Sequence, residues 1–198
     1  MNKNNVLHYI ALTAYNVGFG GKKHFVTYDV LRIVPKAVSL LTMIIGVFQL
    51  LEQYKTVSTD NQQLISVVLL SIGLIAFVVD LSSDPKEEYN IVGKKLLVLF
   101  NELRRIYLEV DSLSDSSDFS TYIARIDAIT QEVSHISISK QVVMGNWLTH
   151  IGFFYVMQSK WVSKELGHTW RDKLPILHFE TLIYVSVAFA IVYSILYL

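Results

Sequence analysis

Three long runs of the chain are apolar and contain no charged residue. Residues 37–51, 64–79 and 181–198 contain no Asp, Glu, Lys or Arg. With their flanks, the first two runs form helices of about 20 residues, which at roughly 1.5 Å per residue cross the hydrocarbon core of a bilayer. The pattern predicts an all-α membrane protein with an N-terminal two-helix transmembrane hairpin at 32–80 and a third transmembrane helix at 175–198.

The pattern becomes amphipathic in residues 81–174. Apolar residues recur there at spacings of three and four, which indicates two helices separated by the polar stretch 111–120. Their apolar faces can bury against each other, against residues 142–157 or against a neighbouring subunit. Because these faces exceed what one thin hairpin covers, we expect them to mediate self-association into a homo-oligomer. The candidate residues are Leu96, Phe100, Leu103, Ile126, Ile129 and Val133.

The distribution of Lys and Arg predicts the topology. Basic residues flank both ends of the hairpin, whereas its internal loop carries only Lys55. The positive-inside rule then places an amphipathic N-terminal segment, residues 1–31, in the cytoplasm together with 81–174, and the C-terminus outside. The short apolar run 142–157 contains Asn146 and His150. We interpret it as a helix that is buried in the cytoplasmic part or lies at the membrane interface, not as another span.

Composition narrows the classes of function. The chain of 198 residues is 52% hydrophobic and 17% charged, with a formal net charge of zero and no cysteine. A neutral chain has no global field that attracts nucleic acid, so we expect no direct nucleic-acid binding. The absence of cysteine excludes disulfides and thiolate metal sites. The six histidines lack the H-E-x-x-H spacing of zinc enzymes. We therefore expect no catalytic residue, cofactor or metal, and no enzyme activity.

The segment NVGFGGKKH, residues 16–24, combines three glycines with Lys22, Lys23 and His24. Such a segment can form a phosphate-binding corner of backbone amides. It lacks the preceding strand of a phosphate loop, however, and a flexible turn with lysines close to lipid headgroups is the favoured interpretation. The three residues are candidates for contact with an anion or with lipid.

Small and polar residues form one stripe along the first span. Their spacings of three and four place them on one helix face, opposite Met43 and Val47. A polar stripe inside a span contacts either another helix or water. The residues are candidates for helix packing or for lining an oligomeric pore: Ser39, Thr42, Gly46, Gln49 and Gln53.

The order of these parts resembles a known family. The segment YNVGFGGKKHFVTYDVLRIVP leads into the two-span hairpin, GKKLLVLFNELRRIYLEVD follows as a long helix, and an apolar segment ends the chain. This order is similar to that of the SLATT family, the SMODS- and SLOG-associating two-transmembrane effector domains of bacterial conflict systems.

Membership would imply an effector in the bacterial inner membrane that stays silent until a sensor protein or a nucleotide second messenger triggers it. Oligomerisation and pore formation would then permeabilise the membrane in abortive infection, an anti-phage defence. The alternative is a scaffold or regulatory membrane protein that does not conduct ions and binds a partner through its cytoplasmic helices. The family supplies no catalytic residues.

Overall fold

The structure is a computed structural model that describes residues 1–50, 58–81, 86–142, 145–157, 159–175 and 186. These residues form helices and connecting segments, with no strand among them. The helices are α1 (Lys3–Gln49), α2 (Thr59–Leu81), α3 (Lys86–Asp111), α4 (Ser120–Ile136), α5 (Gly145–Ile151), the π-helix η2 (Gly152–Val156) and α6 (Lys160–Glu165). The predicted third transmembrane helix at 175–198 lies, except for Pro175 and Ser186, outside the described residues.

The chain divides into two compact units, and α1 contributes to both. The first unit comprises residues 1–26 and 89–198, and the second comprises residues 27–88. The N-terminal segment therefore packs with the amphipathic helices, whereas the sequence suggested a separate segment at 1–31.

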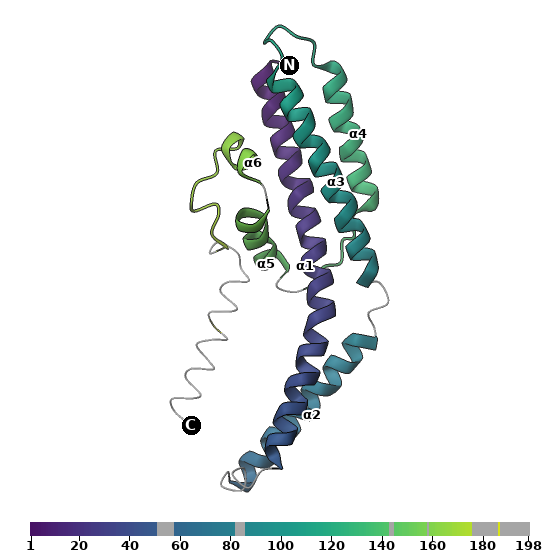
Figure 1. Cartoon of the computed structure of the whole chain (residues 1–198), viewed down its shortest axis with the longest axis vertical. Helices are drawn as coiled ribbons and strands as arrows, with labels where there is room; N and C mark the ends of the chain where they lie inside the picture. Colours follow the sequence, from purple (N-terminus) through teal and green to yellow (C-terminus); the bar gives the residue numbers. More distant parts are fainter. Residues whose placement is uncertain (51–57, 82–85, 143–144, 158, 176–185, 187–198) are drawn as a thin grey trace. The chain divides into compact units, whose positions relative to one another are not determined.

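The core of the first unit lies where residues 3–26 of α1 run side by side with α3 and α4 (Figure 1). The α1 side chains in this core recur at spacings of three and four, as expected for an amphipathic helix. Val6, Ile10, Ala14 and Val17 are at most 2% exposed. A hydrogen bond at the rim of this core also joins α1 to α4. The Tyr9 hydroxyl donates to Asp127 Oδ1 at 2.7 Å.

This core corrects the expectation about what covers the amphipathic faces of α3 and α4. Five of the six residues assigned to self-association are at most 5% exposed within one chain: Leu96, Phe100, Leu103, Ile126 and Ile129. Val133 is partly buried against the same core. Residues 3–26 of α1 supply the covering surface that we expected from a second subunit.

The glycine-rich segment 16–24 is helical in the structure, not a turn. Two of its three glycines, Gly18 and Gly21, lie where other elements approach α1 closely. A Cβ atom added at Gly18 would lie 2.8 Å from the Phe100 ring and 2.9 Å from the Phe153 ring. At Gly21 it would lie 3.2 Å from Leu96 Cβ. Close packing therefore offsets the low helix propensity of glycine. The sequence pattern, in which the three glycines indicated a turn, does not contain this information.

The apolar run 142–157 contains two short helices that pack into the first unit. The helix α5 is 7 residues long and η2 is 5 residues long, so neither is long enough to cross a bilayer. Phe153 is fully buried, and its carbonyl accepts a hydrogen bond from Ser159 Oγ at 2.8 Å.

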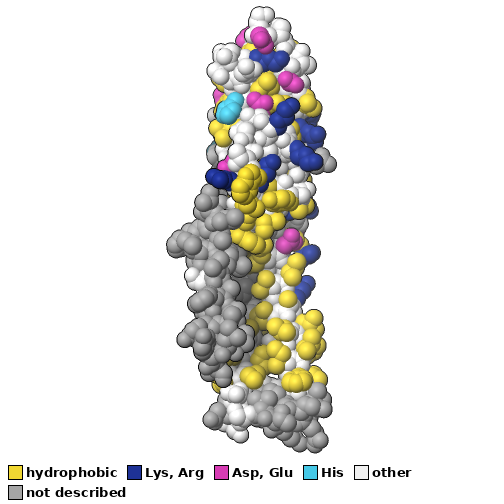
Figure 2. Space-filling model, turned by 90° about the vertical axis from the view of Figure 1, so that its left-hand side faces the viewer, with side chains coloured by type: hydrophobic (Ala, Val, Ile, Leu, Met, Phe, Trp, Pro, Cys, Tyr) yellow, Lys and Arg dark blue, Asp and Glu magenta, His cyan; other side chains and the backbone are white. Residues whose placement is uncertain are grey.

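The second unit is a helical hairpin. Its first arm is the part of α1 from residue 27 to residue 49, and its second arm is α2. Both helices contain a stretch that is long and apolar enough to span a membrane, and only 6% of each stretch is buried. Figure 2 shows hydrophobic side chains on the visible face of the described part of this unit, in its lower half. The core helix of a soluble protein would be mostly buried, whereas outward apolar faces match lipid. The hairpin is therefore the membrane part that the sequence predicted.

Candidate functional site in the membrane hairpin

The polar stripe of the first span lies on the α1 face directed toward α2. Thr42, Gly46 and Gln49 are half-buried, whereas Ser39 is exposed. The Ser39 hydroxyl donates to the carbonyl of Pro35 at 2.9 Å, one turn earlier in the same helix. This bond back to the preceding turn satisfies the hydroxyl within its own helix. Gln53 lies outside the described residues.

Two contacts join the stripe to α2. A Cβ atom added at Gly73 would lie 3.9 Å from Thr42 Cγ2, so α2 passes the stripe at its own small residue. About two turns after Thr42 on α1, Gln49 Nε2 donates to Ser66 Oγ at 3.5 Å, which is the upper limit of distance for a hydrogen bond. Ser66 Oγ in turn donates to the Gln62 carbonyl at 2.9 Å. The middle of the stripe therefore has a packing role within one hairpin.

The stripe is open at two other positions. A Cβ atom added at Gly46 would meet nothing within 4 Å, so no described neighbour uses the small size of this residue. Near the other end, a cavity of about 310 Å³ is lined by Ser39 and Lys36 of α1 and by Ala76 and Phe77 of α2, together with Pro35. A hydroxyl and an ammonium group thus line a hollow beside a transmembrane stretch, where polar groups usually have a function.

The opposite face of α1 is apolar and exposed. Met43 is 60% exposed and Val47 is 59% exposed. Because more than half of each of these apolar side chains is exposed, lipid or another subunit is their natural environment. They provide matched control positions for the stripe.

Lys22, Lys23 and His24, the candidates for anion or lipid contact, stand on α1 within the first unit and do not form a common anion-binding corner. His24 is 3% exposed. Its Nδ1 lies 2.7 Å from the Gly20 carbonyl, and its Nε2 accepts a hydrogen bond from the Ile138 amide at 3.1 Å. The ring is therefore neutral, with the proton on Nδ1. Burial lowers the pKa of His24, and the positive charge of Lys23 lowers it further, against the Gly20 hydrogen bond.

His24 connects α1 to the segment that follows α4. Besides the Ile138 bond, the Tyr89 hydroxyl donates to the Lys140 carbonyl at 2.7 Å, and the rings of His24 and Tyr89 lie 6.0 Å apart. The sequence does not predict this attachment, because nothing local in residues 137–141 indicates a partner more than a hundred positions away. Lys22 packs differently: its aliphatic stem lies against Gly152, where any Cβ atom would collide with it.

Among the residues that the structure describes, no three His, Asp or Glu side chains lie close enough together to hold a metal ion. The expectation that the protein is not an enzyme stays a prediction.

The part of the chain that the structure describes thus combines a helical unit with a hairpin of two outward-apolar helices, each long and apolar enough to cross a membrane. The chain belongs to the family of SMODS and SLOG-associating 2TM effector domain 6, whose family model matches residues 1–183. The resemblance inferred from the sequence is thereby confirmed. This family of effector domains is associated with bacterial conflict and anti-phage systems. Searches of curated proteins and of solved structures gave no match.

Proposed function

We propose that this protein is a membrane effector of a bacterial anti-phage system, in which several copies assemble through the hairpin and permeabilise the inner membrane. The observation that carries the proposal is the polar stripe of α1, which packs on α2 at Thr42 and Gln49 but stays open at Ser39 and Gly46. The polar groups on such a face of a transmembrane helix are stabilised by contact with water or with another subunit.

Several copies are needed because two helices do not enclose an aqueous path. Hydroxyl and amide groups of Ser39, Thr42 and Gln49 would line the path if the α1 helices of neighbouring copies turned toward a common axis. The exposed apolar faces around Met43 and Val47 would then contact lipid or the next hairpin. Self-association is thus assigned to the hairpin, since α1 of the same chain covers the faces of α3 and α4.

The first unit stands in the cytoplasm in this proposal. Residues 1–26 and 89–175 belong to one compact unit, so the chain returns after the hairpin to the side from which it entered. Lys22, Lys23, Lys94 and Lys95 lie in that unit, and basic residues favour the cytoplasmic side. The C-terminus would lie outside if residues 175–198 cross the membrane. A sensor protein or a nucleotide second messenger would act on the first unit and trigger the hairpin.

The test replaces the polar side chains of the stripe with apolar ones. Thr42→Leu combined with Gln49→Leu should abolish depolarisation of the cell, because apolar groups raise the cost of hydrating the path. Met43→Leu combined with Val47→Leu is the control, since it changes the same helix on its exposed apolar face. Membrane potential is measured with a dye after induction and after phage infection, at expression matched by blotting. If the double-Leu stripe variant depolarises cells as the parent does, α1 does not line the conducting path.

A non-conducting scaffold is the second candidate, favoured by the Thr42 contact with Gly73 and the Gln49 contact with Ser66. Gly46→Val distinguishes the two functions. The isolated hairpin has room for a side chain at this position, so a scaffold should keep its activity. A pore built from closely packed copies should lose conductance, because the added methyl groups narrow and dry the path.

A further inference from the structure

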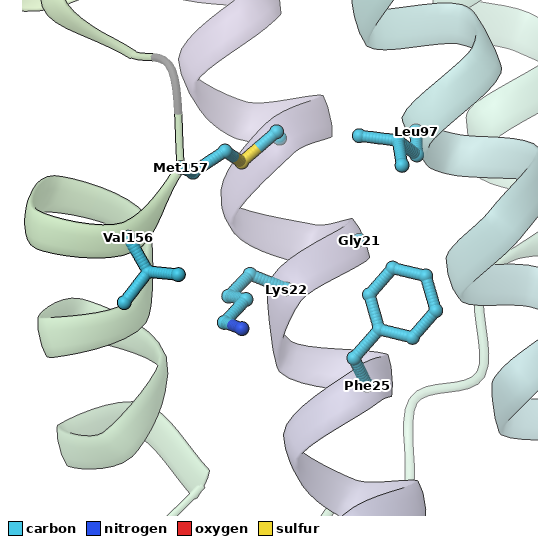
Figure 3. A pocket seen from close by; sticks show the side chains of 7 residues that line it. Gly21, Lys22, Phe25, Leu97, Val156 and Met157 are labelled. Atoms are coloured by element: carbon cyan, nitrogen blue, oxygen red, sulfur yellow. The ribbon is translucent and has the colours of Figure 1, made fainter.

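The first unit contains a groove that the proposed function does not use. Residues of α1 form its floor, with α3 on one side and η2 on the other; Figure 3 shows Gly21, Lys22 and Phe25 on α1 between Leu97 of α3 and Val156 of η2. A cavity of about 200 Å³ lies there. A second cavity of about 470 Å³ has Val156 and Met157 in its lining as well, together with Arg104, Lys160 and Trp161, and we refer to the two neighbouring cavities as the groove.

The walls of this groove are apolar and accessible. Val156 is 74% exposed, Tyr155 is 61% exposed and Leu97 is 38% exposed. The π-helix η2 ends at Val156, and such single π-turns are frequent at functional sites. Contact with water is unfavourable for apolar side chains at roughly 25 cal/mol per Å², so an apolar occupant is favoured.

The charged side chains that line the groove share one sign. Lys22 lines the first cavity, and Arg104 and Lys160 line the second, whereas no Asp or Glu among the described residues lines either one. An occupant that complements both features has an apolar chain and an anionic group. Lys22 stands on α1 only ten positions before Arg32, the first residue of the predicted span. The groove thus belongs to a part of the chain that is close in sequence to the bilayer, where phospholipid is abundant.

We infer that this groove binds one anionic phospholipid, with an acyl chain between Leu97 and Val156 and its anionic headgroup attracted by the charges of Lys22 in the first cavity and of Arg104 and Lys160 in the second. Basic residues beside a membrane typically strengthen the attraction to anionic lipid enough to change the affinity about fivefold each. The site distinguishes phosphatidylglycerol from phosphatidylcholine by charge, and the apolar walls distinguish lipid from a free phosphate.

Trp161 lines the second cavity, which shares Val156 with the first, so its fluorescence reports an acyl chain that lies beside Val156. The full chain with Trp147→Phe and Trp170→Phe keeps Trp161 as its single tryptophan. It is placed in phosphatidylcholine vesicles, and phosphatidylglycerol with brominated acyl chains is added in steps to a quarter of the lipid. We expect Trp161 fluorescence to be quenched at a much lower content of brominated phosphatidylglycerol than of brominated phosphatidylcholine, and inorganic phosphate not to reverse the quenching.

Charge variants identify the cations. Lys22→Met keeps the aliphatic stem that packs on Gly152, and Lys160→Met removes the second charge. Each should raise the phosphatidylglycerol content at half-quenching about fivefold, and the double variant about 25-fold. Arg105→Met is the matched control, because Arg105 is exposed on α3 next to Arg104 and lines neither cavity.

Equal quenching by the two brominated lipids, or an equal effect of Arg105→Met and Lys22→Met, would overturn the inference. Absence of quenching would also overturn it, since the groove would then be closed to acyl chains and suited to a peptide segment instead. Displacement by inorganic phosphate would indicate an anion site without lipid. None of these readouts involves membrane potential, so failure here is separate from failure of the proposed pore.

Discussion

Gly18 and Gly20 are two positions apart on α1, yet the structure predicts opposite effects when each is changed to alanine. In an exposed helix interior, Gly→Ala stabilises by about 1 kcal/mol, because alanine loses less backbone entropy on folding. At Gly20 the added Cβ atom would lie 3.9 Å from Leu96 Cδ1, an ordinary van der Waals contact. We therefore expect Gly20→Ala to raise the free energy of unfolding by about 0.5–1 kcal/mol.

At Gly18 the same Cβ atom would lie 2.8 Å from Phe100 Cδ2 and 2.9 Å from Phe153 Cε2. Phe100 is 2% exposed and Phe153 is 0% exposed, so neither ring has free space to move into. Overpacking a core costs roughly 1–3 kcal/mol, which exceeds the propensity gain of about 1 kcal/mol. We expect Gly18→Ala to lower the free energy of unfolding by about 1 kcal/mol and Gly18→Val by about 2–3 kcal/mol.

Thermal unfolding in one mild detergent, followed by circular dichroism, measures these effects. A change of 1 kcal/mol shifts the midpoint by about 2–4 °C in a chain of this size. The parent, Gly18→Ala, Gly18→Val and Gly20→Ala are compared at equal protein and detergent concentration. If Gly18→Ala melts at or above the parent temperature, close packing is not the role of Gly18.

Two further predictions follow from the first unit. Leu103→Asp places a carboxylate at a fully buried position, so it should abolish cooperative unfolding and not merely dissociate an oligomer; a folded variant of reduced particle mass in detergent would restore the interpretation of this face as a subunit contact. His24 has a lowered pKa because burial disfavours its charged form, so the folded state binds fewer protons than the unfolded state and stability increases with pH. The contribution of His24 is complete above the unfolded pKa of about 6.5 and is lost progressively as the pH falls below it. The melting temperature of the parent should therefore decrease on acidification more than that of His24→Gln, and parallel curves for the two proteins would show that the ring is not held in its neutral form.

The sequence alone determined the class of the protein and the helical elements that have a clear apolar run or an apolar period. A run such as 64–79 has no charged residue and no alternating polar face, so its side chains are stable only in lipid or in a large protein core. The chain is too short to provide such a core for every run. In residues 86–111 the local spacing of Leu96, Phe100 and Leu103 matches the helical period, and α3 has the predicted buried face. These features depend on neighbours within a few positions, which the sequence displays directly.

Only the tertiary structure decided what those faces meet. The apolar stripe of α3 is compatible with α4, with residues 142–157 or with another subunit, and the structure places Val6, Ile10 and Val17 against it. Gly18 has the local signature of a turn, yet Phe100 and Phe153, remote in the chain, require its small size in a helix. Contacts of this kind depend on side chains far apart in sequence, whose complementary shapes leave no periodic signal; the periodicity therefore shows that a face is buried, and three-dimensional packing determines its partner.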